Sequence, residues 1–137
     1  MEPIKIDITI LEPVHKVWAY MNDPKHITKW NFAHESWHCP KAENDLRVGG
    51  QLKTRMEAKD GSFGFDFVGI YDEVVPFEKI GYHLDDGRNV EVHFNSIDEN
   101  TTKVVQIFDP EEQNSREMQR DGWYGILNNF HKYVENN

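Results

Sequence analysis

The feature that most constrains the fold is an amphipathic pattern at the C-terminal end, from Asn114 to Glu135. At about 100° per residue, one stripe and its flank collect most of the apolar residues of this segment. The stripe holds Met118, Gly122, Ile126, Phe130 and Tyr133, and the flank holds Trp123, Leu127 and Val134. Asn114 and Glu117 have the spacing of a capping box, which would start the helix. The pattern predicts one helix of roughly 33 Å whose apolar face must be buried.

Three residues interrupt this apolar face: Gln119, Gly122 and Gly125. Each glycine weakens a helix by about 1 kcal/mol relative to alanine, and a buried amide needs hydrogen-bond partners. Two interpretations remain open. Either the glycines allow close packing and Gln119 lies in an exposed first turn, or the helix roofs a cavity into which Gln119 points.

The N-terminal part predicts one strand followed by two short helices. Four isoleucines alternate with polar residues from Ile4 to Ile10, as in a half-buried strand. Pro13 suits the first position of a helix, and Asp23 can cap a second one. The periodicity is then lost over residues 31–44, which we interpret as a loop with one short strand.

A meander of about five strands follows, from Leu46 to Phe108. Asp60-Gly61 and Asp86-Gly87 predict tight turns, and Gly69 predicts a bulge. Short connections favour antiparallel neighbours. The whole order predicts a single α+β domain, 1–137, in which a curved antiparallel sheet wraps around the long C-terminal helix.

Several motifs make the chain resemble a known superfamily of the helix-grip type, also called START-like, Bet v 1-like or SRPBCC. They are Asp45-Leu46-Arg47-Val48-Gly49-Gly50, Asp60-Gly61-Ser62, Gly69-x-Tyr71-x-Glu73-x-x-Pro76, Thr102, Gly122-Trp123 and Leu127. Within it, the chain is most similar to the family named after the activator of the heat-shock protein 90 ATPase. The resemblance implies a cavity between sheet and helix, commonly used for small apolar or amphipathic molecules, lipids among them. It implies no single activity.

The same resemblance suggests a chaperone as a partner and a stress-related role. The eukaryotic activator has a further N-terminal domain that carries much of its effect, and nothing in this sequence corresponds to it. Regulation of a chaperone or another protein through the surface therefore stands as an alternative to ligand binding.

The aromatic residues point to the ligand-binding hypothesis. They make up 12% of the chain, more than the two short helices need for their packing. Rigid apolar walls with a few polar groups suit a small hydrophobic or aromatic molecule. The residues expected to line its cavity are Gln119, Gly122, Trp123, Ile126, Phe65, Phe67, Tyr82, Phe94, Gln106 and Trp30. Gln106 shares the parity of Val104 and Phe108, so it points either inward or to solvent at a strand end.

A metal site or an enzyme has less support in the sequence. His26, His34, His38 and Cys39 lie close together, but Pro40 disfavours a helix there, and in a strand Cys39 would point away from His38. We therefore expect no metal and no cofactor. Because no acid–base pair with an orienting third group is recognisable, we expect a non-enzymatic protein; a cyclase- or hydrolase-type enzyme is the further alternative.

Charge and cysteine content bound the partners and the compartment. The 24 acidic and 15 basic residues give a net charge of −9, which argues against nucleic acid and anionic membranes. The single cysteine suits a reducing compartment. The sequence shows neither a signal peptide nor an apolar run of about 20 residues. We expect a soluble, cytoplasmic monomer that does not insert into membranes.

Overall fold

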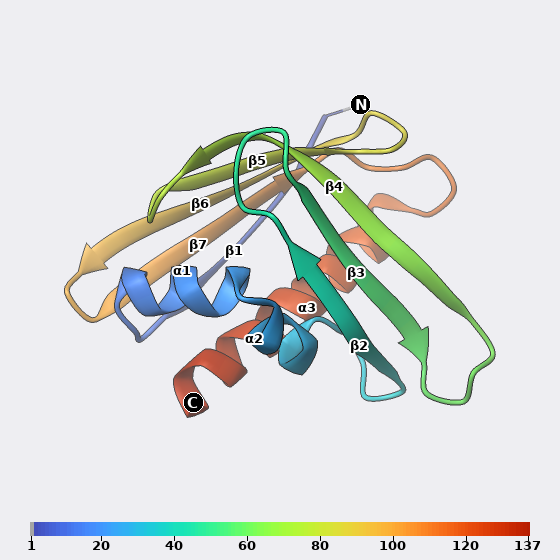
Figure 1. Cartoon of the computed structure of the whole chain (residues 1–137), viewed down its shortest axis with the longest axis horizontal. Coiled ribbons are helices and arrows are strands. Elements are labelled where there is room, and N and C mark those ends of the chain that lie inside the picture. Colours follow the sequence, from blue (N-terminus) through green and yellow to red (C-terminus); the bar gives the residue numbers. More distant parts are fainter. Residues whose placement is uncertain (1) are drawn as a thin grey trace.

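A computed structural model describes residues 2–137 as one antiparallel sheet, two short helices and one long helix (Figure 1). The elements are β1 (Ile4–Ile10), α1 (Val14–Asn22), α2 (Pro24–Trp30), β2 (Trp37–Asn44), β3 (Gln51–Ala58), β4 (Gly64–Val75), β5 (Lys79–Leu84), β6 (Asn89–Asp98), β7 (Thr101–Phe108) and α3 (Arg116–Asn136). Across the sheet the order is β1-β7-β6-β5-β4-β3-β2. The predicted fold class, a curved antiparallel sheet around a long C-terminal helix, is confirmed.

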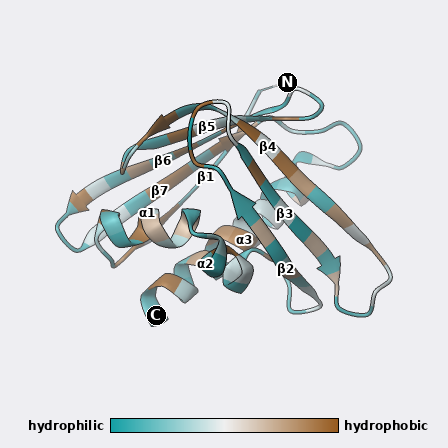
Figure 2. Ribbon diagram, viewed as in Figure 1, coloured by the Kyte–Doolittle hydropathy of each residue, from teal (hydrophilic) through white to brown (hydrophobic). Residues whose placement is uncertain are grey.

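The sheet curls so that α3 runs along its concave side, as Figure 1 shows. Strands β2–β4 lie on one side of α3, and β1 with β5–β7 lies on the other. Helices α1 and α2 cover the space next to α3. In β1, every second residue is buried, which confirms the predicted alternation of its isoleucines. Figure 2 shows the matching bands of hydrophobic and hydrophilic residues along β4.

The C-terminal half of α3 supplies the most deeply buried part of the helix. Leu127, Phe130 and Val134 are almost fully enclosed, and the Phe130 ring meets the Trp30 ring edge-on, with 4.7 Å between centroids. The predicted stripe was centred about one residue too early, because Met118 is 62% exposed. The predicted capping box was also wrong. Ser115 caps the helix by accepting a hydrogen bond from the Met118 amide at 3.1 Å.

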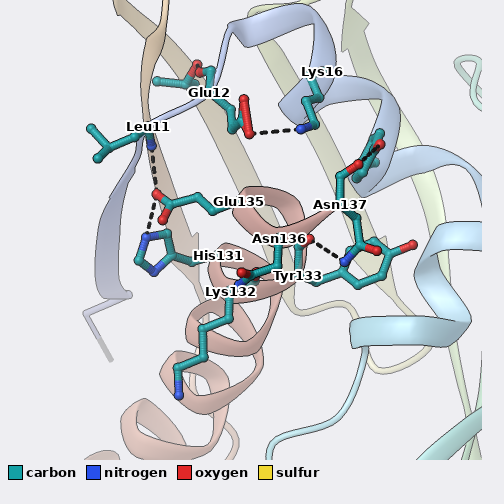
Figure 3. A network of polar contacts seen from close by, with 11 residues as sticks. Leu11, Glu12, Lys16, His131, Lys132, Tyr133, Glu135, Asn136 and Asn137 are labelled. Atoms are coloured by element: carbon teal, nitrogen blue, oxygen red, sulfur yellow. Dashed lines mark hydrogen bonds and ion pairs between the residues drawn. The ribbon is translucent and has the colours of Figure 1, made fainter.

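The far end of α3 is fixed to the loop that follows β1 (Figure 3). The Leu11 amide donates a hydrogen bond to Glu135 Oε2 at 2.8 Å. The same carboxylate oxygen contacts His131 Nε2, one helical turn earlier, at 2.8 Å. One glutamate therefore satisfies a backbone donor of the loop and holds the helix against β1.

Strand β2 is longer than the short strand that the sequence predicted for residues 31–44. Its pairing with β3 shifts register between His38 and Lys41, which hides the alternation in the sequence. Pro40 has no amide hydrogen to donate, and such a residue fits a strand at the edge of a sheet. Because β2 is the edge strand, this position accepts proline.

Two glycines explain parts of the motifs quoted above. Gly50 follows the β2–β3 turn, where a side chain would collide with the backbone carbonyl of Asp45. Gly69 does not form the predicted bulge, which instead lies between Tyr71 and Glu73. At Gly69 an added Cβ would lie 2.6 Å from the Tyr82 ring. The missing side chain makes room for that ring.

Truncation of Phe130 tests whether α3 is held by its buried face. Phe130→Ala should lower the free energy of unfolding by about 3–5 kcal/mol, because it removes a large, fully buried side chain. Met118→Ala, on the exposed face of the same helix, should change it by less than about 0.5 kcal/mol. Urea unfolding of both variants measures the difference. Equal losses would contradict the packing described for α3.

Candidate functional site: a cavity between the sheet and α3

A cavity of about 320 Å³ lies between the concave face of the sheet and α3. Its floor comes from alternate residues of β3 to β7. Its roof includes Trp123 and Ile126 of α3. Met21, Ile27 and Trp30 close the side formed by α1 and α2. This volume lies near the lower end of the range of about 300–1,000 Å³ for small-molecule sites.

Seven of the ten predicted lining residues are brought together around this cavity. They are Trp30, Phe65, Phe67, Tyr82, Gln106, Trp123 and Ile126. The other three, Phe94, Gln119 and Gly122, lie outside the lining. Parity along the strands placed four of these on the floor, because side chains two positions apart share a face of the sheet. Six further strand residues line the floor and were not predicted to do so: Leu52, Thr54, Met56, Tyr71, Ile80 and Val92.

Gln119 fills a structural role, so both interpretations of it were wrong. Its Oε1 accepts a hydrogen bond from the Glu111 amide at 2.8 Å. Its Nε2 donates to the Glu111 carbonyl at 3.0 Å and to the Asn114 carbonyl at 2.9 Å. The amide is thus buried but fully used in holding the loop before α3, and it points neither to solvent nor into the cavity.

Gly122 and Phe94 lie outside the cavity, each in different surroundings. A Cβ added at Gly122 would meet no atom within 4 Å, so no close neighbour requires the glycine. At Gly125 an added Cβ would lie 3.2 Å from the Ala33 side chain, so this second glycine does allow close packing. Phe94 belongs to the core next to α1, where its ring meets the Trp18 ring edge-on at 5.0 Å.

The aromatic walls of the cavity are held by contacts with one another. Trp123 stacks on Phe108 with 4.1 Å between centroids and an interplanar angle of 9°. Phe67 meets Trp123 at 6.2 Å and Tyr82 at 6.3 Å, in both cases edge-on. Trp30 Nε1 donates to the Tyr20 carbonyl at 3.0 Å. Rings fixed in this way form a preorganised apolar surface.

A polar group at one side of the cavity was missed by the sequence analysis. The Tyr71 hydroxyl donates to Asn44 Oδ1 at 2.6 Å, and Asn44 Nδ2 donates to the Asn22 carbonyl at 2.8 Å. These contacts join β4, β2 and the end of α1, and all three residues line the cavity. Tyr71 has the parity of Phe67, so its inward direction was readable once Gly69 is taken as regular strand.

Three other polar side chains of the lining make no hydrogen bond with a described residue: Thr54, Tyr82 and Gln106. Thr54 is 2% exposed, and its Oγ1 is enclosed by its neighbours. Tyr82 is 9% exposed. Buried hydroxyls normally have partners. The cavity therefore combines apolar walls with unused hydrogen-bonding capacity.

The lining carries little charge. Arg88 is its only charged residue within the described chain, and its Nε already donates to Asp86 Oδ2 at 2.7 Å. Burial raises the pKa of the Tyr82 hydroxyl above its ordinary value. Burial likewise raises the pKa of the Tyr71 hydroxyl, which its hydrogen bond to Asn44 only partly offsets. Both tyrosines are therefore neutral donors at physiological pH.

The histidines and the cysteine of the N-terminal half each have different contacts and do not form one cluster. His26 contacts the Tyr133 hydroxyl, His34 contacts Ser36, and His38 lies 3.7 Å from Glu57. Cys39 is buried, and burial raises the pKa of its thiol. Within residues 2–137, no group of three or more His, Cys, Asp or Glu side chains has the arrangement of a metal site.

Asp45 and Arg47, from the first motif quoted above, form an ion pair, with Arg47 Nε 2.9 Å from Asp45 Oδ2. Both side chains are exposed, and they lie in the turn that ends at Gly50, where the Gly50 amide donates to the Arg47 carbonyl at 2.8 Å. The pair therefore belongs to the turn and does not contribute to the cavity.

A cavity enclosed between a curved antiparallel sheet and a long C-terminal helix defines a helix-grip protein. The family model described as "Activator of Hsp90 ATPase homolog 1-like protein" matches residues 12–135. The chain belongs to this family. Among curated proteins, none is similar enough to count as a relative.

Solved structures agree with this assignment. The AHSA1-like protein from Aeromonas hydrophila is 41% identical, with a TM-score of 0.87 over 97% of this chain and 93% of that one. A protein from Cytophaga hutchinsonii is 48% identical, with a TM-score of 0.84 over 98% and 92% of the two chains. A protein from Chromobacterium violaceum, at 24% identity and a TM-score of 0.85 over 98% and 99%, shares the fold. None of the described helices is long and apolar enough to cross a membrane.

Two neighbouring tyrosines provide a matched test of the hydrogen bonds in the cavity. Tyr71→Phe should cost about 1–2 kcal/mol of unfolding free energy, because it leaves Asn44 Oδ1 without its donor. Tyr82→Phe removes a hydroxyl that has no hydrogen-bond partner within residues 2–137, and it should cost less than about 0.5 kcal/mol, or stabilise slightly. Urea unfolding compares them. A loss for Tyr82→Phe as large as that for Tyr71→Phe would mean that the Tyr82 hydroxyl is satisfied within the protein.

The raised pKa values of Tyr71 and Tyr82 predict a loss of stability at alkaline pH. Above about pH 10 the unfolded chain releases two protons that the folded state retains. Their contribution is therefore complete below pH 10 and decreases as the pH rises further, by up to about 1.4 kcal/mol per pH unit for each tyrosine. Urea unfolding at pH 9 to 11 measures the slope, and Tyr82→Phe should reduce it. An identical slope in that variant would contradict the assignment.

Proposed function

We propose that this protein binds a small hydrophobic or aromatic molecule in the cavity between the sheet and α3. The observation that carries the proposal is an apolar space of about 320 Å³ walled by fixed aromatic rings. Natural ligand sites are concave and mostly apolar, and they contain a few polar groups that orient the ligand. The family supports the proposal, because its fold commonly encloses such molecules.

Binding, without a reaction, is the function that the lining supports best. The described lining contains neither a carboxylate nor a histidine, and general acid–base catalysis uses such groups most often. We therefore propose a carrier or a sensor of its ligand, in the cytoplasm and as a monomer, and not a cyclase or hydrolase.

A surface cluster favours a second candidate, a protein-interaction module such as a chaperone regulator. Trp37, Phe63 and Phe65 lie within 6.0–6.2 Å of one another, centroid to centroid. Phe63 is 60% exposed and Phe65 is 42% exposed. Exposed aromatic clusters occur at protein interfaces. The first candidate is preferred because Phe65 also lines the cavity, so the cluster can equally serve the entrance of a ligand.

Titration with N-phenyl-1-naphthylamine, an uncharged fluorescent probe, tests the cavity. The wild-type protein should bind it with saturation, and Trp30 and Trp123 should be quenched in parallel because both line the cavity. Ile126→Phe places a larger side chain in the roof and should weaken binding at least about tenfold.

Gly122→Ala is the matched control on the same helix, because its new methyl group meets no atom within 4 Å. It should leave the affinity for the probe unchanged. If the probe binds Ile126→Phe as tightly as wild type, or binds the wild type only without saturation, the proposed cavity function is wrong. A Phe63→Ser variant that loses the probe while Ile126→Phe keeps it would favour the surface candidate.

A further inference from the structure

Tyr82 stands out from the other lining residues because the sheet is built around its ring. Gly69 lies in the middle of β4, in regular register with Leu52 and Leu84. A glycine inside a strand weakens it, and the space left by its missing side chain is the space that the Tyr82 ring occupies. Phe67 and Tyr71 contact the same ring edge-on, at 6.3 and 5.9 Å between centroids. The position of the ring is therefore fixed from three sides.

The hydroxyl on this fixed ring makes no hydrogen bond with a described residue. Its neighbour Tyr71, directly opposite in the β4–β5 pairing, has a committed partner in Asn44 at 2.6 Å. Tyr82 is only 9% exposed, and it lines the cavity. A tyrosine hydroxyl at this depth normally has a partner. Thr54 makes no hydrogen bond with a described residue either, but its Oγ1 is enclosed by its neighbours, which leaves Tyr82 as the accessible hydroxyl of the two.

We propose that Tyr82 is the hydrogen-bonding anchor of the cavity, and that the ligand is an uncharged, compact aromatic molecule carrying an oxygen acceptor. The inference rests on the binding function proposed above and names the ligand class for that site. The hydroxyl donates its proton to the acceptor oxygen, and the ligand ring lies among Phe67, Trp123 and Trp30.

Three properties of the lining define this class. A neutral phenol donates to a carbonyl, ether or hydroxyl oxygen, and burial keeps Tyr82 neutral. The positive charge of Arg88 is already balanced by Asp86. An ionised ligand group would therefore add an unbalanced charge to the cavity, and burying such a charge is costly. A volume of about 320 Å³ suits a compact ring system better than a long acyl chain.

Gln106 gives the ligand a second polar contact from another wall. It lies on β7, between Ile6 of β1 and Val92 of β6 in the register of the sheet. Its amide makes no hydrogen bond with a described residue, and it also lines the cavity. The amide can donate and accept, so it tolerates different substituents. We assign the preference for an acceptor oxygen to Tyr82, and to Gln106 a contact that acceptors and donors can both use.

Three naphthalenes of the same shape test the inference by displacement of N-phenyl-1-naphthylamine. 2-Acetylnaphthalene carries an acceptor oxygen, 2-isopropenylnaphthalene replaces that oxygen by a methylene group, and 2-naphthoate carries a charge. The wild-type protein should prefer the acetyl compound over the isopropenyl compound about five- to tenfold. The naphthoate should bind most weakly of the three.

Tyr82→Phe should abolish this preference while leaving the affinity for 2-isopropenylnaphthalene unchanged. Tyr133→Phe is the control, because it removes a tyrosine hydroxyl that contacts His26 outside the cavity; it should keep the preference. Equal affinity of the wild type for both neutral compounds overturns the inference, as does a preference that survives in Tyr82→Phe or tightest binding of the naphthoate. In these cases the probe still binds and the proposed cavity function stands. Failure of the wild type to bind the probe itself overturns both.

Discussion

The packing of α3 against the concave face of the sheet is the interaction on which the rest of the structure depends. The C-terminal half of the helix is enclosed, with Phe130 against Trp30 and its end held by Glu135. In the N-terminal half, Trp123 stacks on Phe108 and Ile126 faces open space. One helix cannot fill the whole concave side of a sheet that curls along its full length. The C-terminal half of α3 fills its part of the concave side of the sheet, and the cavity is the space between the sheet and the N-terminal half of the helix.

The polar groups of the cavity divide into those that the fold uses and those that it leaves free. The hydrogen bonds among Tyr71, Asn44 and Asn22 join three elements and contribute to stability. Thr54 is buried without such a partner, which costs stability, and the Tyr82 hydroxyl makes no hydrogen bond with a described residue. Local departures from good packing or hydrogen bonding are typical of functional sites. The contrast between two adjacent tyrosines therefore carries more information about function than the fold does.

Family membership identifies a fold with a cavity, and the residues that line the cavity decide what it binds. A fold of this kind can serve carriers, sensors and enzymes, because specificity comes from a few side chains set on a common framework. In this chain two features of the framework belong to the motifs quoted above: the turn ending at Gly50 and the gap at Gly69. Apart from Tyr71 and Trp123, the lining lies outside these motifs, and so does the exposed aromatic cluster at Phe63.

Periodicity and turn signals alone predicted the α+β class, the long C-terminal helix, the β1 strand and four residues of the cavity floor. Periodicity reports which side of an element is buried, and these elements are regular. Only the tertiary structure decided the role of Gln119, the length of β2 and the reason for Gly69. Each depends on contacts that no local sequence pattern records. Gln119 binds the backbone of the loop before α3, β2 shifts its register around Pro40, and the Tyr82 ring of the next strand occupies the space beside Gly69. Local periodicity gives the direction of a side chain, and only the folded chain supplies the atoms that it meets.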